Sequence, residues 1–453
     1  MWGWTFLVLA AAFAWQTRRV GPRLALGQVT FLALLVPAWA YLGYQSAGIE
    51  LQFTGVPVDA KTAIGFVGLL VCATRPRQLF AWRLTWVDLA VALMAVVHVL
   101  ADWRADGLSA MPLLRAFGEW VLPYAVGRAT IQSVDDLRAL LPVAIAVTLA
   151  LAAVAGFEAL LRVNAFEWAY GNRPIEYMPR HMSRWGLKRA YGPAKHPIFL
   201  GMMLLMLTPW AIYAASYARR GHWASWWIWT PVAVVFGIVF TVSRGPIIGV
   251  AVALAVAVYL LFPRLRKPLW GVAGVIVAVL LLQPRAVLET LHMSSGESKW
   301  RRTRQVEIDG EMKRFSGTEA RLYLFDVYGE ALRRAGLLGF GTEAVTGFPV
   351  NVPVGPENVE TLKSVRFIDN IYVLTTLRFG YLGLVALVTL LGASIVDWWR
   401  RTTAARGAPA FCAGATGALA GAAIVMLTVW MPHDFGFLIL WTAGAGSGLR
   451  AGE

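Results

Sequence analysis

Residues 139–161 read ALLPVAIAVTLALAAVAGFEALL, and Glu158 is the only charged side chain among them. A helix needs about 20 predominantly apolar residues to cross the roughly 30 Å hydrocarbon core of a membrane. This stretch meets that requirement without interruption. It therefore predicts a helix that spans a membrane.

Similar runs recur along the whole chain, which is 58% hydrophobic and only 15% charged. Soluble domains carry about 25% charged residues, so most of this chain faces lipid or other buried helices. The sequence predicts an all-α polytopic integral membrane protein with about 12–14 transmembrane helices. Thirteen candidate spans lie at residues 2–16, 24–44, 62–74, 85–101, 112–128, 139–161, 197–217, 223–243, 246–262, 269–287, 369–397, 408–431 and 435–449.

The connectors between these runs predict the orientation. Lys and Arg collect in cytoplasmic loops of membrane proteins, and every second connector is basic. The residues concerned are Arg18, Arg19, Arg23, Arg75, Arg77, Arg83, Arg128, Arg138, Arg219, Arg220, Arg264, Arg266, Lys267, Arg400, Arg401 and Arg406. These loops explain most of the net charge of +15 through contact with anionic headgroups. The sequence contains no basic, aromatic-lined soluble domain, so we expect no nucleic-acid partner.

One predicted outer loop departs from this charge rule. Residues 162–196 contain seven basic side chains, from Arg162 to Lys195, against Glu167 and Glu176. Cations kept on the outer face against the usual bias indicate an anionic ligand there. The domains predicted are a helical region 1–287 that includes this loop, a large outer loop domain 288–368, and C-terminal helices 369–453.

Several short segments at the predicted outer ends of spans carry groups suited to an anion. Ser243-Arg244-Gly245-Pro246 joins two spans, and an Arg next to a helix N-terminus is a good phosphate receptor. The alternative is an Arg that reaches the headgroups with a purely structural role. Arg189, Lys195 and His196 precede the span that starts at Pro197. Arg189 and Lys195 suit anion binding, whereas His196 is either a proton acceptor or structural.

The large loop contains a second group of candidates. Residues 317–338 predict an amphipathic helix that ends near Gly336. Arg321 and Tyr323 lie in its first turns, where Arg321 binds an anion or pairs with a nearby carboxylate. Asp369-Asn370-Ile371-Tyr372 opens the next span, and Asp369 is either a helix cap or a general base.

These segments together resemble the O-antigen ligase and polymerase family of bacterial envelope proteins. The family pattern is an Arg-Gly pair at the outer end of a span (243–246), an Arg-led helix with a Gly-rich end (321–341), and a polar motif that enters the next span (369–373), followed by 378–383. Residues 190–202 resemble the family's Gly and His-Pro stretch.

The resemblance implies a metal-independent membrane glycosyltransferase with an all-helical, GT-C-like body and no cofactor. Its partners would be an undecaprenyl-pyrophosphate-linked glycan donor, a glycan acceptor, membrane lipid, and chain-length or export proteins. The active face would be the periplasmic side of the bacterial inner membrane. The resemblance assigns pyrophosphate binding to Arg244 and Arg321, with Arg189 next.

One departure from the family favours a polymerase over a ligase. Ligases that use lipid A-core carry a His where this chain has Asp369. The group that activates the acceptor therefore stays open between Asp369, His196 and no side chain at all.

Two other functions are compatible with the sequence. One is a transporter of lipid-linked sugars, for which the charged or titratable residues Asp88, His98 and Glu119 inside spans give little support. The other is a non-catalytic assembly subunit.

Overall fold

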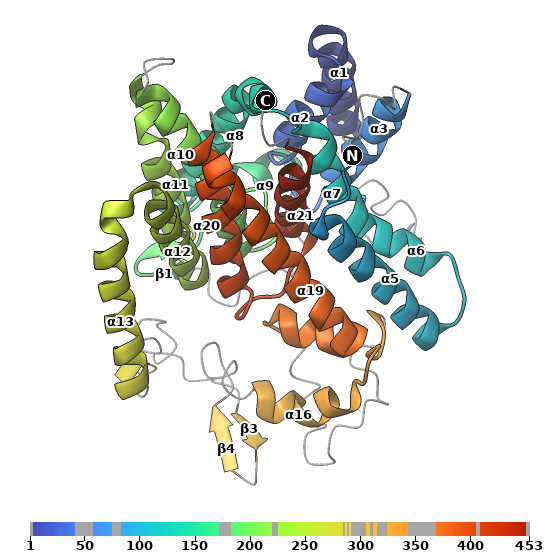
Figure 1. Ribbon diagram of the computed structural model, residues 1–453, viewed down its shortest axis with the longest axis vertical. Helices are drawn as coiled ribbons and strands as arrows, with labels where there is room; N and C mark the ends of the chain where they lie inside the picture. The colour runs from blue at the N-terminus through green and yellow to red at the C-terminus, as the bar shows by residue number, and fades with distance from the viewer. Residues whose placement is uncertain are drawn as a thin grey trace.

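The computed structural model describes residues 3–40, 58–74, 83–171, 183–219, 225–283, 286–287, 290, 305–308, 311–314, 324–342, 368–404 and 408–449. These residues are almost entirely helical (Figure 1). The N-terminal helices are α1 (Gly3–Val20), α2 (Pro22–Ala33), α3 (Ala60–Ala73), α5 (Trp86–Asp106), α6 (Met111–Ala116), the π-helix η1 (Phe117–Val121), α7 (Leu122–Thr130), α8 (Val134–Leu161) and α9 (Ala165–Tyr170).

The middle and C-terminal helices complete the bundle. They are α10 (Pro197–Arg219), η3 (Ser225–Trp229), α11 (Thr230–Phe240), α12 (Arg244–Leu261), η4 (Pro263–Leu265), α13 (Arg266–Leu282), α16 (Leu324–Arg334), α19 (Ile371–Ala404), α20 (Pro409–Val425) and α21 (His433–Gly448). Two short antiparallel hairpins lie in the predicted outer loops, β1–β2 (Ser183–Arg184, Leu187–Lys188) and β3–β4 (Gln305–Ile308, Glu311–Arg314).

Five described helices are long and apolar enough to cross a membrane. They are Trp86–Asp106, Val134–Leu161, Pro197–Arg219, Arg244–Leu261 and Ile371–Thr403, with shorter apolar helices at Ala60–Ala73, Ser225–Phe240 and Pro409–Val425. The predicted all-α polytopic membrane fold is therefore confirmed. The count of thirteen spans and the three-domain division stay predictions.

Contacts between distant connectors follow the predicted alternation of the two ends. Arg23 of the first basic connector pairs with Asp136 of the third one, with Nη2 and Oδ1 2.8 Å apart. At the opposite end, Trp4 stacks on Tyr170 with ring centroids 5.7 Å apart. We call the first end the predicted cytoplasmic end, and the end that holds residues 162–171, 189–197, 241–246, 368–372 and 426–434 the predicted outer end.

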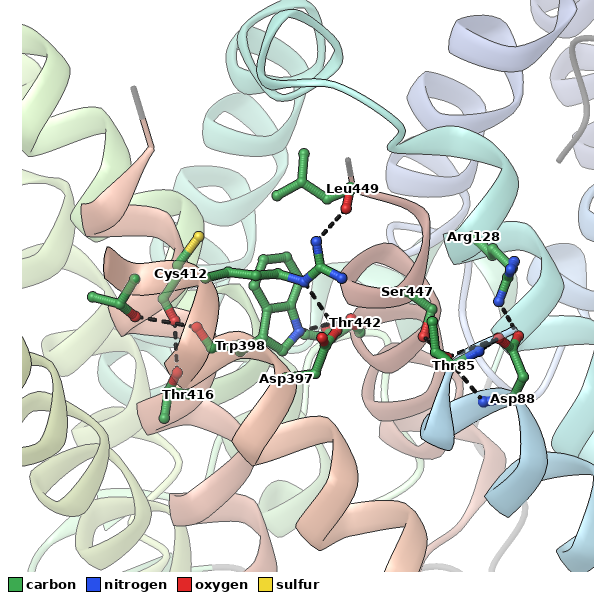
Figure 2. Close-up of polar contacts among 12 residues, drawn as sticks. Thr85, Asp88, Arg128, Asp397, Trp398, Cys412, Thr416, Thr442, Ser447 and Leu449 are labelled. Carbon is green, nitrogen blue, oxygen red and sulfur yellow. Dashed lines mark hydrogen bonds and ion pairs between the residues drawn. The ribbon is translucent and has the colours of Figure 1, made fainter. Parts of the chain in front are cut away.

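At the predicted cytoplasmic end, α5, α7, α19 and α21 are joined by paired charges (Figure 2). Arg128 pairs with Asp88, which also accepts a 2.6 Å hydrogen bond from the hydroxyl of Tyr124. Thr85 and Ser447 join α5 to α21 through their hydroxyls, 3.1 Å apart. The guanidinium of Arg401 bonds both Asp397 and the carbonyl of Leu449. Each charge here has an opposite partner, so the network is structural.

Three predicted helix limits are corrected by the structure. The span predicted at 24–44 ends at Ala33, just before Pro37, which cannot continue a helix. The helix predicted to start at Pro246 begins at Arg244. The span predicted at 369–397 continues to Ala404 but is kinked at Gly380, whose φ is 69°.

Within the predicted outer loop 288–368, the structure describes the hairpin β3–β4, the helix α16 with the turns that follow it, and the single residues 290 and 368. The predicted helix 317–338 is confirmed over Leu324–Arg334 and ends before Gly336, whose φ is 59°. Its predicted start at Gly317, with Arg321 and Tyr323, lies outside the described residues. Figure 1 shows α16 beneath the first segment of α19, at the predicted outer end.

Candidate active site

The turn between α11 and α12 fixes Arg189 beside the start of α12. The hydroxyl of Ser243 donates to the carbonyl of Thr241 at 3.0 Å and accepts from Nη2 of Arg189 at 3.2 Å. A serine at this position normally caps the helix by accepting from a first-turn amide, but Ser243 makes no such bond. Its hydroxyl therefore orients Arg189 at a helix end whose partial charge is positive.

The backbone around Arg189 is held by a buried carboxylate. Oε2 of Glu158, which is 0% exposed, accepts from the amides of Tyr191 at 3.0 Å and Gly192 at 2.8 Å. Its Oε1 pairs with Nζ of Lys188 at 3.2 Å. On the other side, the amide of Ala190 donates to the carbonyl of Phe240 at 3.2 Å. Arg189 is thus presented from a segment fixed at both α8 and α11.

Close helix packing holds α12 against α10 and α20. A Cβ added to Gly201 of α10 would lie 2.6 Å from Cβ of Pro246. Gly245 faces α20, and a Cβ there would lie 3.1 Å from Cγ1 of Val425 and 3.6 Å from Oγ1 of Thr428. Arg244 and Gly245 remain half-buried. The Arg-Gly motif therefore combines a cation with a contact that leaves little room for a side chain.

The start of α19 reaches the same end through Asn370, which caps the helix. Its Oδ1 accepts from the amides of Tyr372 at 2.9 Å and Val373 at 3.1 Å, and its Nδ2 donates to the carbonyl of Leu427 at 3.0 Å. The hydroxyl of Tyr372 donates to the carbonyl of Ala423 at 2.8 Å. These bonds attach α19 to α20, and Asn370 takes the capping role considered for Asp369.

Asp369 lies close enough to α16 to affect one of its side chains. Burial raises the pKa of the Tyr328 hydroxyl on α16, and the carboxylate of Asp369 raises it further. Because Tyr328 is fully buried, α16 covers the entrance to α19 rather than standing apart from it. This contact brings the loop helix to the same end as Ser243 and Asn370.

The turns after α16 dock into the kink of α19. The amides of Phe340 and Gly341 donate to the carbonyls of Leu377 at 2.7 Å and Arg378 at 2.9 Å. A Cβ on Gly339, whose φ is 66°, would lie 2.5 Å from the backbone of Arg378. The Gly-rich motif 335–341 and the motif 378–383 are therefore two halves of one joint.

Predicted residues from three separate segments gather at this end. Arg189, Lys195, His196, Ser243, Arg244, Gly245, Asp369, Asn370 and Tyr372 all lie there, whereas Arg321 and Tyr323 lie outside the described residues. The backbone amide of Lys195 donates to Oδ2 of Asp434 at 3.1 Å, which ties this segment to α21. His196 uses Nδ1 to accept from the amide of Ile198 at 3.2 Å, so it caps α10.

Sequence reasoning missed a buried polar cluster at the start of α3. Asp59 pairs with Nζ of Lys61 at 2.6 Å, and both side chains are at most 4% exposed. Oδ1 of Asp59 accepts from the hydroxyl of Thr62 at 3.0 Å, and this hydroxyl lies 2.8 Å from Nε2 of His433. Burial works to raise the pKa of Asp59, but Lys61 and His433 outweigh it and hold that pKa well below its usual value.

Comparison with known families bears directly on this arrangement. Residues 230–388 match the family model described as O-antigen ligase. The chain carries an O-antigen ligase family domain. The resemblance predicted from the short motifs is thereby confirmed. No curated protein matches the chain.

The O-antigen ligase match runs from the start of α11 into α19. It includes Ser243, Arg244 and Asp369, together with the joint between α16 and the kink of α19. Arg189, Glu158 and the Asp59 cluster lie outside the matched residues, yet they pack against the same end of the bundle. The O-antigen ligase domain is thus completed by segments from the N-terminal half and by α21.

Proposed function

We propose that this protein is a glycosyltransferase that uses an undecaprenyl-pyrophosphate-linked glycan on the periplasmic face of the bacterial inner membrane. The observation that carries the proposal is the fixed placement of Arg189 by Ser243 at the N-terminus of α12, beside Arg244. Guanidinium groups and helix N-termini both bind phosphate oxygens.

The reaction needs negative charge to be stabilised where it develops. An acceptor hydroxyl attacks the anomeric carbon, and the bond to the pyrophosphate breaks with its electron pair on the leaving oxygen. Arg189 and Arg244 would stabilise that oxygen, and removing one such group typically costs about 100- to 1,000-fold in rate. Arg189 is pre-oriented by Ser243 and by the segment that Glu158 holds, so little reorganisation is required during the reaction.

Within this family, we propose a polymerase that extends exopolysaccharide, capsule or O-antigen repeats. The support is Asp369, which stands where ligases that use lipid A-core carry a His. Asp369 lies beside α16 at the entrance of α19, where an acceptor glycan would approach. A ligase that joins glycan to a lipid or protein is the alternative within the same chemistry.

The packing of the opposite end favours a transferase over a transporter. A transport path for a lipid-linked sugar would have to cross the predicted cytoplasmic end. There Arg128 pairs with Asp88 and Arg401 pairs with Asp397 (Figure 2). There α7 and α21 approach so closely that a Cβ on Gly127 would meet the carbonyl oxygen of Trp441. Opening such a path would separate both ion pairs and this helix contact.

The test is a reconstituted transfer assay. Purified protein in lipid vesicles is given a synthetic polyprenyl-pyrophosphate repeat unit, with a second repeat unit or lipid A-core as the acceptor. We expect released polyprenyl pyrophosphate together with a lengthened glycan, and transfer slowed by about 100- to 1,000-fold with Arg244→Ala. Transfer to lipid A-core alone would identify a ligase, and donor binding without transfer to either acceptor would overturn the proposal.

A further inference from the structure

We infer that His433 accepts the proton of the attacking glycan hydroxyl through Nδ1, and that Asp59 and Thr62 orient its ring. The inference rests on the proposed function and assigns the acceptor side of that reaction. His433 is the first residue of α21, and its side chain is 13% exposed. Asp59 and Thr62 come from the start of α3, and Thr62 precedes His433 by 371 residues in the sequence.

The hydrogen bonds around Thr62 determine which ring nitrogen is protonated. The carboxylate of Asp59 is ionised, because its buried ion pair with Nζ of Lys61, at 2.6 Å, keeps it charged, so it can only accept. The hydroxyl of Thr62 therefore donates its one proton to Oδ1 of Asp59, at 3.0 Å. Toward Nε2 of His433, at 2.8 Å, the same hydroxyl must then accept. Nε2 thus carries the proton in the neutral ring.

The basic nitrogen of His433 is consequently Nδ1. A neutral imidazole with one protonated nitrogen accepts a proton at the other. In the part of the chain that the structure describes, Nδ1 of His433 takes part in no hydrogen bond. Asp59, whose Oδ1 lies 3.6 Å from Nε2, would stabilise the imidazolium after proton uptake. An imidazole with a fixed tautomer and a carboxylate behind it is a typical general base.

His433 differs in this respect from His196, which lies at the same end of the bundle. Nδ1 of His196 accepts from the amide of Ile198 at 3.2 Å and is engaged in capping α10. Among the residues that the structure describes, Asp59 and Lys61 at the start of α3 lie around His433, and Asp434 follows it on α21. Lys195 and His196 belong to the segment that Asp434 binds.

A chain of contacts connects His433 to the arginines that would hold the leaving group. Asp434, its neighbour, accepts from the amide of Lys195, two residues before α10 begins. Along α10, the rise from Pro197 to Gly201 is about 6 Å, and Gly201 packs against Pro246 in the first turn of α12. His433 and the first turn of α12 are thus joined at the predicted outer end through the segment that leads into α10.

The proposed step balances in atoms and electrons. The acceptor oxygen forms a bond to the anomeric carbon while its proton moves to Nδ1 of His433. The bond from the anomeric carbon to the pyrophosphate oxygen breaks, and the electron pair leaves with the pyrophosphate held by Arg189 and Arg244. The proton on His433 then passes to water, and the ring returns to its Nε2-protonated form.

The test measures the pH dependence of polyprenyl pyrophosphate release by the reconstituted full-length protein. Positioned general bases contribute about 100- to 10,000-fold to rate, so His433→Gln should lower kcat by that order, leave the KM for the donor unchanged, and remove the acid limb of the profile. Asp59→Asn should move that limb to lower pH, because the imidazolium loses a stabilising carboxylate. Thr62→Val should also reduce kcat, but it should move the acid limb less than Asp59→Asn does.

Two comparison variants keep the outcome decisive. His196→Asn preserves a helix cap and should keep the acid limb, and thermal unfolding in detergent identifies any variant that fails to fold. If wild type transfers glycan and His433→Gln keeps both its rate and its acid limb, the inference is wrong while the proposed function stands. The inference is equally wrong if Asp369→Asn, rather than His433→Gln, removes the limb. Absence of transfer by wild type contradicts the proposed function itself.

Discussion

The two ends of the bundle carry similar charged residues but use them differently. At the predicted cytoplasmic end, Arg128 pairs with Asp88 (Figure 2). It also donates to the carbonyl of Arg83, so its charge stabilises helix contacts. At the predicted outer end, Arg189 is oriented by the hydroxyl of Ser243 beside the first turn of α12. The charges of the first end maintain helix contacts, and we propose that Arg189 and Arg244 at the second end bind the leaving pyrophosphate.

The largest difference is expected for Arg244. Arg244→Ala should lower the transfer rate by about 100- to 1,000-fold, because a group that stabilises the leaving pyrophosphate is lost. The unfolding temperature in detergent should stay near that of wild type. Arg401→Ala at the opposite end is the matched control, and it should lose stability while each folded molecule still turns over. Equal loss of activity in both variants would remove the distinction between the ends.

A large effect on stability is expected at the predicted cytoplasmic end. Arg128→Ala leaves the half-buried Asp88 without its cationic partner, which should cost about 3 kcal/mol of unfolding free energy. Chemical denaturation in detergent measures this cost. The double variant Arg128→Met with Asp88→Asn should recover most of it, because no charge is then left unpaired. If the double variant is as unstable as the single one, the pair is not the cause.

A smaller loss of stability is expected where α7 and α21 meet. A Cβ on Gly444 would fall on the carbonyl oxygen of Tyr124, and overpacking of this kind costs about 2 kcal/mol. Gly444→Ala should therefore lower the unfolding temperature. Gly274→Ala on α13, where a Cβ would meet nothing within 4 Å, is the matched control and should be neutral.

A moderate effect, on substrate binding rather than on stability, is expected when the carboxylate that holds the Arg189 segment is replaced. Glu158→Gln keeps one acceptor for the amides of Tyr191 and Gly192 but loses the ion pair with Lys188. Loss of a charge-assisted bond should weaken the fixed placement of Arg189 and raise the KM for the donor about tenfold. Steady-state kinetics test this, and a change confined to stability would assign Glu158 a purely structural role.

The smallest effects compare two serines at helix starts. Ser133 caps α8 at the predicted cytoplasmic end, accepting from the amide of Asp136 at 3.2 Å. Ser133→Ala should cost about 1 kcal/mol of stability and no activity. Ser243 caps nothing with its side chain, so Ser243→Ala should raise the KM for the donor and leave stability nearly unchanged. Reversal of this pattern would contradict the assigned roles.

The helical fold was predictable because span length and loop charge are local properties of the sequence. The kink at Gly380 was not, because residues 369–397 form one apolar run and the kink exists only with its docking partner around Gly339. The residue that caps α19 could not be predicted either, because Asp369 and Asn370 are adjacent in the sequence and only the backbone geometry selects Asn370.

The candidate site was predictable where a short motif carried a cation, and not where distant residues combine. Arg189 and Arg244 follow from the outer-face charge, but the bond from Arg189 to Ser243 joins residues 54 positions apart. Asp59 and His433 are separated by most of the chain, and neither belongs to a motif. Asp59 alone reads as an ordinary helix cap, which it also is.

We propose that the end holding Arg244 faces the outside and binds the lipid-linked pyrophosphate. Cysteine introduced at Thr428, which lies beside Gly245, should react with a membrane-impermeant maleimide in intact cells. The native Cys72 and Cys412 are buried, and Arg138→Cys, at an exposed position of the opposite end, should react only after permeabilisation. We expect a polyprenyl-pyrophosphate donor to slow labelling of Thr428→Cys. Labelling only from inside, or labelling that the donor does not slow, would contradict an outward-facing pyrophosphate site.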